Sequence, residues 1–258
     1  MGGSPPVRVR DLTMAFGDFV VQRDLSFDVG RGEIFVIMGG SGCGKSTLLK
    51  HMVGLIRPAK GRVLYGEQDL WQAGEDLNPA ILRGIGVLYQ SGALWSSLTL
   101  AENVALPLTE LADVSPARAR ELAALKLRLV GLKGFEDHYP FEISGGMRKR
   151  AALARAIALD PEILYLDEPS AGLDPVSAHL LDRLVIELRD SLGATLVVVT
   201  HELASIFAIA DDSVFLDAET KTLLARGSPR QLLDECEEPA VIEFLTRGEG
   251  RPGRDAGI

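Results

Sequence analysis

The sequence predicts an α/β fold whose core is a parallel sheet, with an antiparallel N-terminal subdomain and a helical subdomain added to it. Three largely apolar runs, at residues 34–38, 163–166 and 195–199, are followed by segments of helical character. Strands that are apolar along their whole length are buried on both faces, as in parallel sheets covered by helices. These runs therefore predict the central strands of the core.

The N-terminal part of the chain has the pattern of an antiparallel sheet. Residues 7–29 contain two alternating segments, VRVRDL and VVQRDLSFDV, with a Gly17-Asp18 turn between them. Alternation of apolar and polar residues is typical of strands with one buried face. Residues 1–6 show no periodicity, so we expect them to form a flexible end.

Helices account for most of the remaining chain. A helix is expected at residues 46–55, and a helical subdomain at about 98–158 contains a helix at 115–129 that Gly131 terminates. We attribute the apolar face of that helix to core packing. After His201 we expect a helix, a hairpin-like pair at 213–217 and 222–227, and a C-terminal helix that begins at Ser228-Pro229. One domain would then span residues 7–247, with a second flexible end at 248–258.

Composition excludes several classes of protein. The 258 residues include 27 Lys and Arg against 36 Asp and Glu, a net charge of −9, and 47% are hydrophobic, which excludes intrinsic disorder and argues against a nucleic-acid partner. Cys43 and Cys236 lack CxxC spacing, so we expect free thiols in a reducing compartment and no structural zinc. The apolar runs are too short to cross a bilayer and no leader segment is evident, so we expect a cytoplasmic protein that reaches a membrane through a partner.

The strongest motif is GGSGCGKST, which fits the P-loop pattern G-x-x-x-x-G-K-[ST] between a buried strand and a helix. Glycine lets a phosphate approach the backbone closely, and successive N–H groups and the helix N-terminus then bind its charge. Lys45 would span the β and γ phosphates, Ser46 would offer a hydroxyl to Mg²⁺, and Cys43 would be a tolerated small side chain. The predicted nucleotide-binding residues are Gly39, Gly40, Ser41, Gly42, Cys43, Gly44, Lys45, Ser46 and Thr47.

A second motif, ILYLDEP, places two carboxylates at the end of a buried strand. Asp167 can hold Mg²⁺ through water, and Glu168 can act on the water that attacks the γ phosphate. Adjacent carboxylates at a strand end are often only solvated charges. Beside a P-loop, they predict phosphoanhydride hydrolysis.

Three further positions extend the candidate site. EISGGMRKR places Ser144 and two glycines before a helix, either as an anion-binding helix start or as a simple N-cap. SAGLDP follows the acidic pair, and the strand at 195–199 leads to His201. Ligand contacts are common at the carboxyl ends of parallel strands.

The order of P-loop, Gln90, ISGGM, LDEP, SAGLD and TH resembles the nucleotide-binding subunit of ABC transporters, from Leu12 to the C-terminal helix. The resemblance implies ATP and Mg²⁺ as cofactors, and two copies that clamp two ATP molecules head to tail as a homodimer. It assigns Glu168 as catalytic base and His201 as the switch histidine. It also assigns adenine stacking to Phe16, a link between Mg²⁺ and the permease to Gln90, γ-phosphate contacts to Ser144, Gly145 and Gly146, a crossing-loop role to Asp174, and metal binding to Ser46, Gln90 and Asp167.

Residues 90–108 and 144–164 are similar to a narrower group, the MlaF-like ATPases of Mla and other MCE-type lipid transport systems. Met147 departs from the usual ABC signature but fits this group's pattern. The similarity implies a phospholipid-transport motor on the cytoplasmic side of the inner membrane. Its partners would be an MlaE-like permease, an MCE-domain protein and, in some systems, a STAS-domain protein. Residues 241–245 match the start of the group's C-terminal extension, although the tail that follows here is short.

Two other functions stay open at this point. The chain could drive an ABC transporter of another solute, or act as a soluble ABC-type ATPase scaffold, as in iron-sulfur assembly. The single motif set excludes tandem-cassette translation factors, and the lack of a long coiled-coil insert between Gln90 and Ser144 excludes DNA-repair types. Trp95, in the segment SGALW, favours docking to a permease, with burial in the helical subdomain as the alternative.

Overall fold

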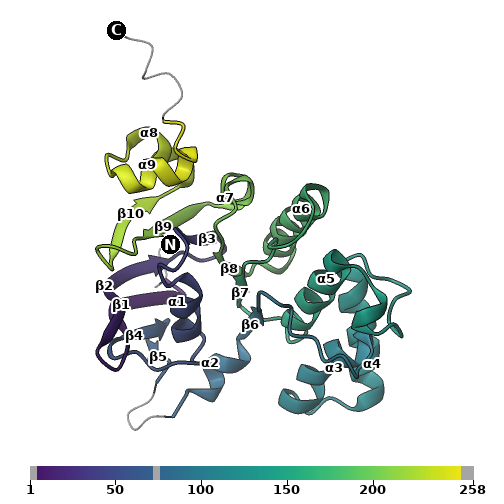
Figure 1. Cartoon of the computed structure of the whole chain (residues 1–258). Coiled ribbons are helices and arrows are strands. Elements are labelled where there is room, and N and C mark those ends of the chain that lie inside the picture. The colour runs from purple at the N-terminus through teal and green to yellow at the C-terminus, as the bar shows by residue number, and fades with distance from the viewer. Residues whose placement is uncertain (1–4, 72–75, 251–258) are drawn as a thin grey trace. The chain divides into compact units, whose positions relative to one another are not determined.

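The computed structural model describes residues 5–71 and 76–250, and the chain folds into two compact units (Figure 1). Unit 1 comprises residues 1–78 and 197–258, and unit 2 comprises residues 79–196. Most of the two expected flexible ends, residues 1–4 and 251–258, lies outside the described residues. Pro6, which we expected in the flexible end, is buried, and its carbonyl oxygen accepts a hydrogen bond from Gly66 N at 3.0 Å.

The N-terminal part of unit 1 is an antiparallel sheet, as predicted. Strands β1 (Val7–Phe16) and β2 (Phe19–Val29) pair around the turn at Gly17, whose φ of 59° suits glycine. Strands β4 (Lys60–Tyr65) and β5 (Gln68–Asp69) extend the sheet in the order β2-β1-β4-β5. These two strands were not predicted because both are short and neither has an alternating pattern of its own.

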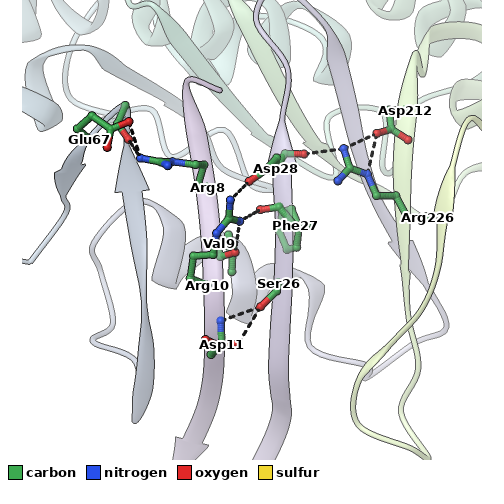
Figure 2. Close-up of polar contacts among 11 residues, drawn as sticks. Arg8, Val9, Arg10, Asp11, Ser26, Phe27, Asp28, Glu67, Asp212 and Arg226 are labelled. Atoms are coloured by element: carbon green, nitrogen blue, oxygen red, sulfur yellow. Dashed lines mark hydrogen bonds and ion pairs between the residues drawn. The ribbon is translucent and has the colours of Figure 1, made fainter. Parts of the chain in front are cut away.

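Polar contacts fasten this sheet along one side (Figure 2). Arg8 pairs with Glu67 at 3.0 Å, and Arg10 pairs with Asp28 at 2.5 Å. Arg226 donates to the carbonyl oxygen of Asp28 at 3.0 Å and pairs with Asp212 at 2.9 Å. The charged side chain of Arg226 thus joins the N-terminal sheet to the C-terminal part of unit 1.

The parallel strands of unit 1 surround β3 (Ile34–Gly39), in which every residue is buried. Strand β9 (Asp212–Leu216) pairs with β3 in parallel, and β10 (Leu223–Gly227) pairs with β9 as the predicted hairpin. Helix α1 (Lys45–Met52) follows β3 and is shorter than predicted, because Gly54 has a φ of 81° that ends the helix.

Three more helices complete unit 1, namely α7 (Leu203–Ile209), α8 (Pro229–Glu235) and α9 (Pro239–Thr246). Ser228 caps α8 by accepting a hydrogen bond from Gln231 N. We expected one C-terminal helix and find two, because the chain becomes extended at Cys236 and proline at the first position of α9 starts a new helix.

Unit 2 contains the predicted helical region. Helices α3 (Leu100–Leu111), α4 (Pro116–Leu129) and α5 (Gly145–Ala156) pack on one another, as Figure 1 shows. Ser115 is the N-cap of α4, so that helix begins one residue later than predicted. Shorter elements are α2 (Pro79–Arg83) and a 3₁₀ turn, η1 (Pro140–Glu142).

The strands of unit 2 end next to these helices. Strand β6 (Ile85–Leu88) pairs in parallel with β7 (Ile163–Asp167), which is buried throughout and precedes α6 (Pro175–Leu192). Strand β8 (Thr195–Val199) is also fully buried, with residues 195–196 in unit 2 and 197–199 in unit 1. Among the described residues, no helix has both the length and the apolarity to cross a bilayer.

Candidate functional site

The predicted P-loop links β3 to α1 in unit 1, and its glycines are required by its backbone. Gly39 and Gly44 have φ values of 148° and 96°. A Cβ on Gly39 would lie 2.3 Å from the carbonyl oxygen of Leu216, and one on Gly44 would lie 2.7 Å from Val21 Cγ1. Both positions therefore exclude a side chain, and the loop keeps the bare backbone that a phosphate needs.

Lys45 is held inside this loop. Its Nζ donates to the carbonyl oxygens of Gly39 at 3.0 Å and Gly40 at 2.9 Å, and the residue is 8% exposed. The Sγ of Cys43 lies 3.8 Å from the same nitrogen, and burial raises the pKa of the Cys43 thiol while Lys45 opposes that shift. Cys43 thus stays a neutral, buried side chain at neutral pH, as expected for a structural position. Neither Cys43 nor Cys236 forms a disulfide.

His201 belongs to the same neighbourhood of unit 1. The backbone N–H of Thr200 donates to the carbonyl oxygen of Ile37 in β3, which places His201 at the carboxyl edge of the strands. His201 and Gly40 both line a cavity of about 480 Å³, together with the aromatic side chains of Phe215 and Phe244. Phe16, at the end of β1, is half exposed and so offers a free aromatic face.

The two predicted carboxylates lie together at the end of β7 in unit 2. Asp167 and Glu168 are each 6% exposed. Glu168 has a φ of 47°, a left-handed conformation that is uncommon for residues other than glycine and that concentrates at functional sites. The strand end therefore presents a buried acidic pair on a strained backbone.

A residue that the sequence analysis missed, Lys149, connects this pair to Gln90. The Nζ of Lys149 donates to the carbonyl oxygens of Gln90 and Glu168, the latter at 3.1 Å. Burial lowers the pKa of Lys149, and the negative charges of Asp167 and Glu168 counteract that shift. The only sequence signal was a lysine on the α5 face that also carries the buried residues Ala152 and Leu153.

The starts of α5 and α6 also lie close to each other. Ser144 is the N-cap of α5, and its Oγ accepts a hydrogen bond from Met147 N at 3.3 Å. The N-cap role is therefore confirmed, and anion binding at this helix start stays a prediction. Asp174 caps α6 by accepting from Ser177 Oγ and from backbone N–H groups, and these bonds, led by that of Ser177 Oγ, lower its pKa. A Cβ on Gly146 would lie 3.5 Å from Ser177 Oγ.

The segment after Gln90 is partly exposed, and side chains of Asn103 and Arg155 hold its backbone. Arg155 donates to the carbonyl oxygens of Gly92 at 2.9 Å and Ala93 at 2.7 Å. Trp95 is 61% exposed, which rules out the alternative that it is buried in the helical subdomain. A cavity of about 390 Å³ opens between β6, α3 and α5, and its apolar lining includes Leu82, Ile85, Val87, Leu106, Pro107 and Leu111.

The candidate residues therefore form two groups. Unit 1 carries Phe16, residues 39–47 and His201, whereas unit 2 carries Gln90, residues 144–146, Asp167, Glu168 and Asp174. Residues 22–171 match the ABC transporter family, more than half of the chain. The chain belongs to the ABC transporter family. This ABC ATPase therefore binds and hydrolyses nucleotide, and the predicted family and fold class are confirmed.

Curated relatives support the narrower similarity. The chain is 38% identical over 243 residues to the intermembrane phospholipid transport system ATP-binding protein MlaF of Haemophilus influenzae, covering 94% of this chain and 90% of that protein. It is 39% identical over 239 residues to the probable ribonucleotide transport ATP-binding protein mkl of Mycobacterium leprae, covering 93% of this chain and 68% of that protein. The predicted resemblance to MlaF-like proteins is thus confirmed.

A solved structure shows the same fold. The dimeric ABC cassette MJ0796, in a post-hydrolysis state with ADP and Pi, superposes with a TM-score of 0.75 at 29% identity. The superposition covers 86% of this chain and 98% of that one. The mixed α/β architecture, with antiparallel and parallel strands, is therefore that of an ABC cassette.

Proposed function

We propose that this ABC ATPase is the motor subunit of an Mla/MCE-type system that moves phospholipids between membranes. One observation carries the proposal: the similarity to MlaF extends over 94% of this chain and 90% of that protein. Similarity on that scale extends well beyond the common nucleotide-binding motifs.

In this proposal the P-loop binds the phosphates of ATP. The backbone N–H groups of the loop and the start of α1 face the phosphate charge, and Lys45 exchanges its bonds to the Gly39 and Gly40 carbonyls for bonds to phosphate oxygens. Phe16 stacks on the adenine. Because the lysine already lies in the loop, it needs only a small side-chain movement to reach the ligand.

The remaining oxygen donors suit Mg²⁺. Ser46, Gln90 and Asp167 offer hydroxyl, amide and carboxylate oxygens, the hard ligands that Mg²⁺ prefers. When bound, the ion would neutralise the phosphate charge that develops during hydrolysis. Glu168 accepts the proton of the attacking water, and its buried position at the strand end keeps the carboxylate away from bulk solvent. His201 contacts the γ phosphate from the edge of unit 1.

The complete site is proposed to need a second copy of the chain, whose Ser144, Gly145 and Gly146 would meet the first copy's ATP. The dimeric MJ0796 cassette supports this arrangement, and the start of α5 is exposed and so open to a ligand from outside. Asp174 would lie at the crossing between the copies. Ser144→Arg should preserve ATP binding by the single chain and stop turnover, and full turnover by this variant would contradict a shared site.

The exposed Trp95 and the apolar cavity beside β6 are proposed to receive an MlaE-like permease at the cytoplasmic side of the inner membrane, in a complex with an MCE-domain protein and, in some systems, a STAS-domain protein. An aromatic anchor at an interface contributes about 2 kcal/mol or more. Trp95→Ala should therefore weaken permease assembly about 30-fold while the basal ATPase rate and the melting temperature of the lone subunit stay at the parent values. Assembly at the parent affinity would remove Trp95 from the interface.

The transport function itself is tested in vesicles that contain the assembled complex. Fluorescent phospholipid should move between donor and acceptor vesicles only with hydrolysable ATP, and Glu168→Gln should abolish that transfer. The relative mkl is named for ribonucleotide transport, so uptake of labelled ribonucleotide is measured in parallel. Ribonucleotide uptake without lipid transfer would replace the phospholipid proposal with that second function.

A further inference from the structure

A glutamine outside all the predicted motifs contacts the P-loop directly. Gln22 lies in β2, opposite Met14 of β1, and is fully buried. Its Nε2 donates to the carbonyl oxygen of Cys43 at 2.8 Å and to that of Asp217 at 2.7 Å. One amide group therefore ties the P-loop both to the antiparallel sheet and to the segment that follows β9.

The two bonds leave no choice of orientation for the Gln22 amide. Both neighbours are carbonyl oxygens, so only the NH₂ group can face them, and its two hydrogens are both used. The Oε1 atom is buried without a hydrogen-bond partner. A buried polar atom without a partner costs free energy; leucine or methionine would avoid that cost but would leave the carbonyl oxygens of Cys43 and Asp217 without these two donors. The amide donors must therefore serve a purpose beyond packing.

That purpose follows from the geometry of the peptide unit between Cys43 and Gly44. In a planar trans peptide the C=O and the following N–H point in opposite directions. A bond that draws the Cys43 carbonyl toward Gln22 therefore turns the Gly44 N–H to the other side. Gly44, at a φ of 96°, has the freedom to let this peptide flip, because it has no Cβ.

We propose that Gln22 is a positioning residue for ATP binding: it locks the Cys43–Gly44 peptide so that the Gly44 N–H faces the phosphates. The proposal rests on the P-loop being the ATP site. Without the lock, the loop would divide its time between two peptide orientations, and only one would bind phosphate. The apparent affinity for ATP then equals the intrinsic affinity multiplied by the fraction of loops in the binding orientation.

The first test uses Gln22→Met, which keeps the length of the side chain and removes both donors. ATP affinity of the full chain, measured by calorimetry, should fall about tenfold. That is the size expected when the hydrogen bond from Gly44 N–H to a charged phosphate oxygen is lost. In turnover assays KM should rise by the same factor while kcat changes by less than about twofold, because the contact is made equally in the ground and transition states.

The matched control is Met14→Leu. The Cε of Met14 packs beneath the same Gly44, where it would lie 3.4 Å from an added Cβ, but it donates no hydrogen bond. A volume-conserving change there disturbs the packing of the loop alone. Its ATP affinity should equal that of the parent. An equal loss of affinity in both variants, or a lowered melting temperature with unchanged affinity in Gln22→Met, would overturn the positioning role.

Gln22→Glu gives a second, independent readout. The carboxylate would face two carbonyl oxygens and repel them, whereas the protonated acid can donate one hydrogen bond. Relative to the parent at each pH, ATP affinity of this variant should therefore recover as the pH falls from about 8 to about 6, since burial favours the neutral acid. A ratio that does not change with pH would contradict the proposal.

Lys45→Ala, measured beside these variants, separates the two levels of inference. If Lys45→Ala binds ATP like the parent, the P-loop assignment itself fails. If Lys45→Ala loses affinity while Gln22→Met keeps it, only the role of Gln22 fails.

Discussion

The P-loop of unit 1 and the acidic strand end of unit 2 differ in the chemical groups that form them and in the side chain that holds each in place. The P-loop consists of backbone groups on glycines, and a neutral amide, Gln22, ties it to the neighbouring strands. The strand end consists of two buried carboxylates, and a cation, Lys149, ties it to Gln90. A loop that must bind a highly charged phosphate keeps its N–H dipoles available with a neutral tether. At the acidic strand end a positively charged tether is favourable, because it offsets the two negative carboxylates.

The difference also predicts that the two regions control different steps. The P-loop is proposed to contact phosphate before and during the reaction, so changes there should alter affinity. The strand end is proposed to act on the attacking water, so changes there should alter the rate with affinity retained. Each variant below tests this division.

The largest effect is expected from Glu168→Gln. Removing a general base typically lowers the rate about 10² to 10⁴-fold, while the amide keeps the shape of the side chain. ATP affinity, measured by calorimetry, should stay at or above that of the parent because one negative charge near the phosphates is lost. Hydrolysis at the parent rate would exclude Glu168 as the base.

Lys45→Ala should have the next largest effect, and on affinity. A hydrogen bond from a charged donor contributes about 1.5 to 3 kcal/mol, so ATP should bind about 10- to 150-fold more weakly. The comparison between the regions breaks down if this variant keeps its affinity and loses only turnover.

Lys149→Met should lower turnover about tenfold at unchanged ATP affinity, because the base remains but is less well placed. Arg150→Met is the matched control. Arg150 also lies on α5 and burial also lowers its pKa, but it donates to the carbonyl oxygens of Val130 and Gly131 instead. Both variants should melt at lower temperature. Only Lys149→Met should turn over more slowly, and equal turnover in the two would show that Lys149 is merely structural.

The smallest effect concerns the two cysteines. Burial raises the pKa of Cys43, so little thiolate is present at neutral pH, whereas Cys236 is more exposed. An alkylating reagent at about pH 7 should modify Cys236 about fivefold faster than Cys43, as measured by mass spectrometry of the two peptides. The rate at Cys43 should rise as the pH increases toward its raised pKa, and bound ATP should slow it. Faster labelling of Cys43 would show that the P-loop opens.

Much of this molecule follows from local sequence. The continuous apolar runs predicted β3, β7 and β8, and the alternation of residues 7–29 predicted the antiparallel pair. The P-loop could be predicted because its own backbone dictates glycine: Gly39, Gly42 and Gly44 have φ values of 148°, 77° and 96°. A local backbone requirement of this kind leaves a glycine pattern that can be recognised in the sequence.

The residues that were missed act over long distances in sequence. Gln22 lies 195 residues from Asp217, and Lys149 lies 59 residues from Gln90. In the sequence, one looks like a polar residue in an alternating strand and the other like a charge on a helix. Neither has a local pattern, because its role exists only once distant carbonyl groups are brought together. The two short strands β4 and β5 were missed for the same reason, since pairing with β1 and with each other defines them.

The arginines along the N-terminal sheet also bear on how the chain avoids mispairing. Val7 and Val9 are buried opposite Val29 and Phe27, while Arg8, between them, lies opposite Asp28. If β1 slipped by one residue during folding, every side chain would change faces, and arginine would enter the apolar interior without a carboxylate. The ion pairs of Figure 2 form only in the native register, so they favour that register over one shifted by a single residue.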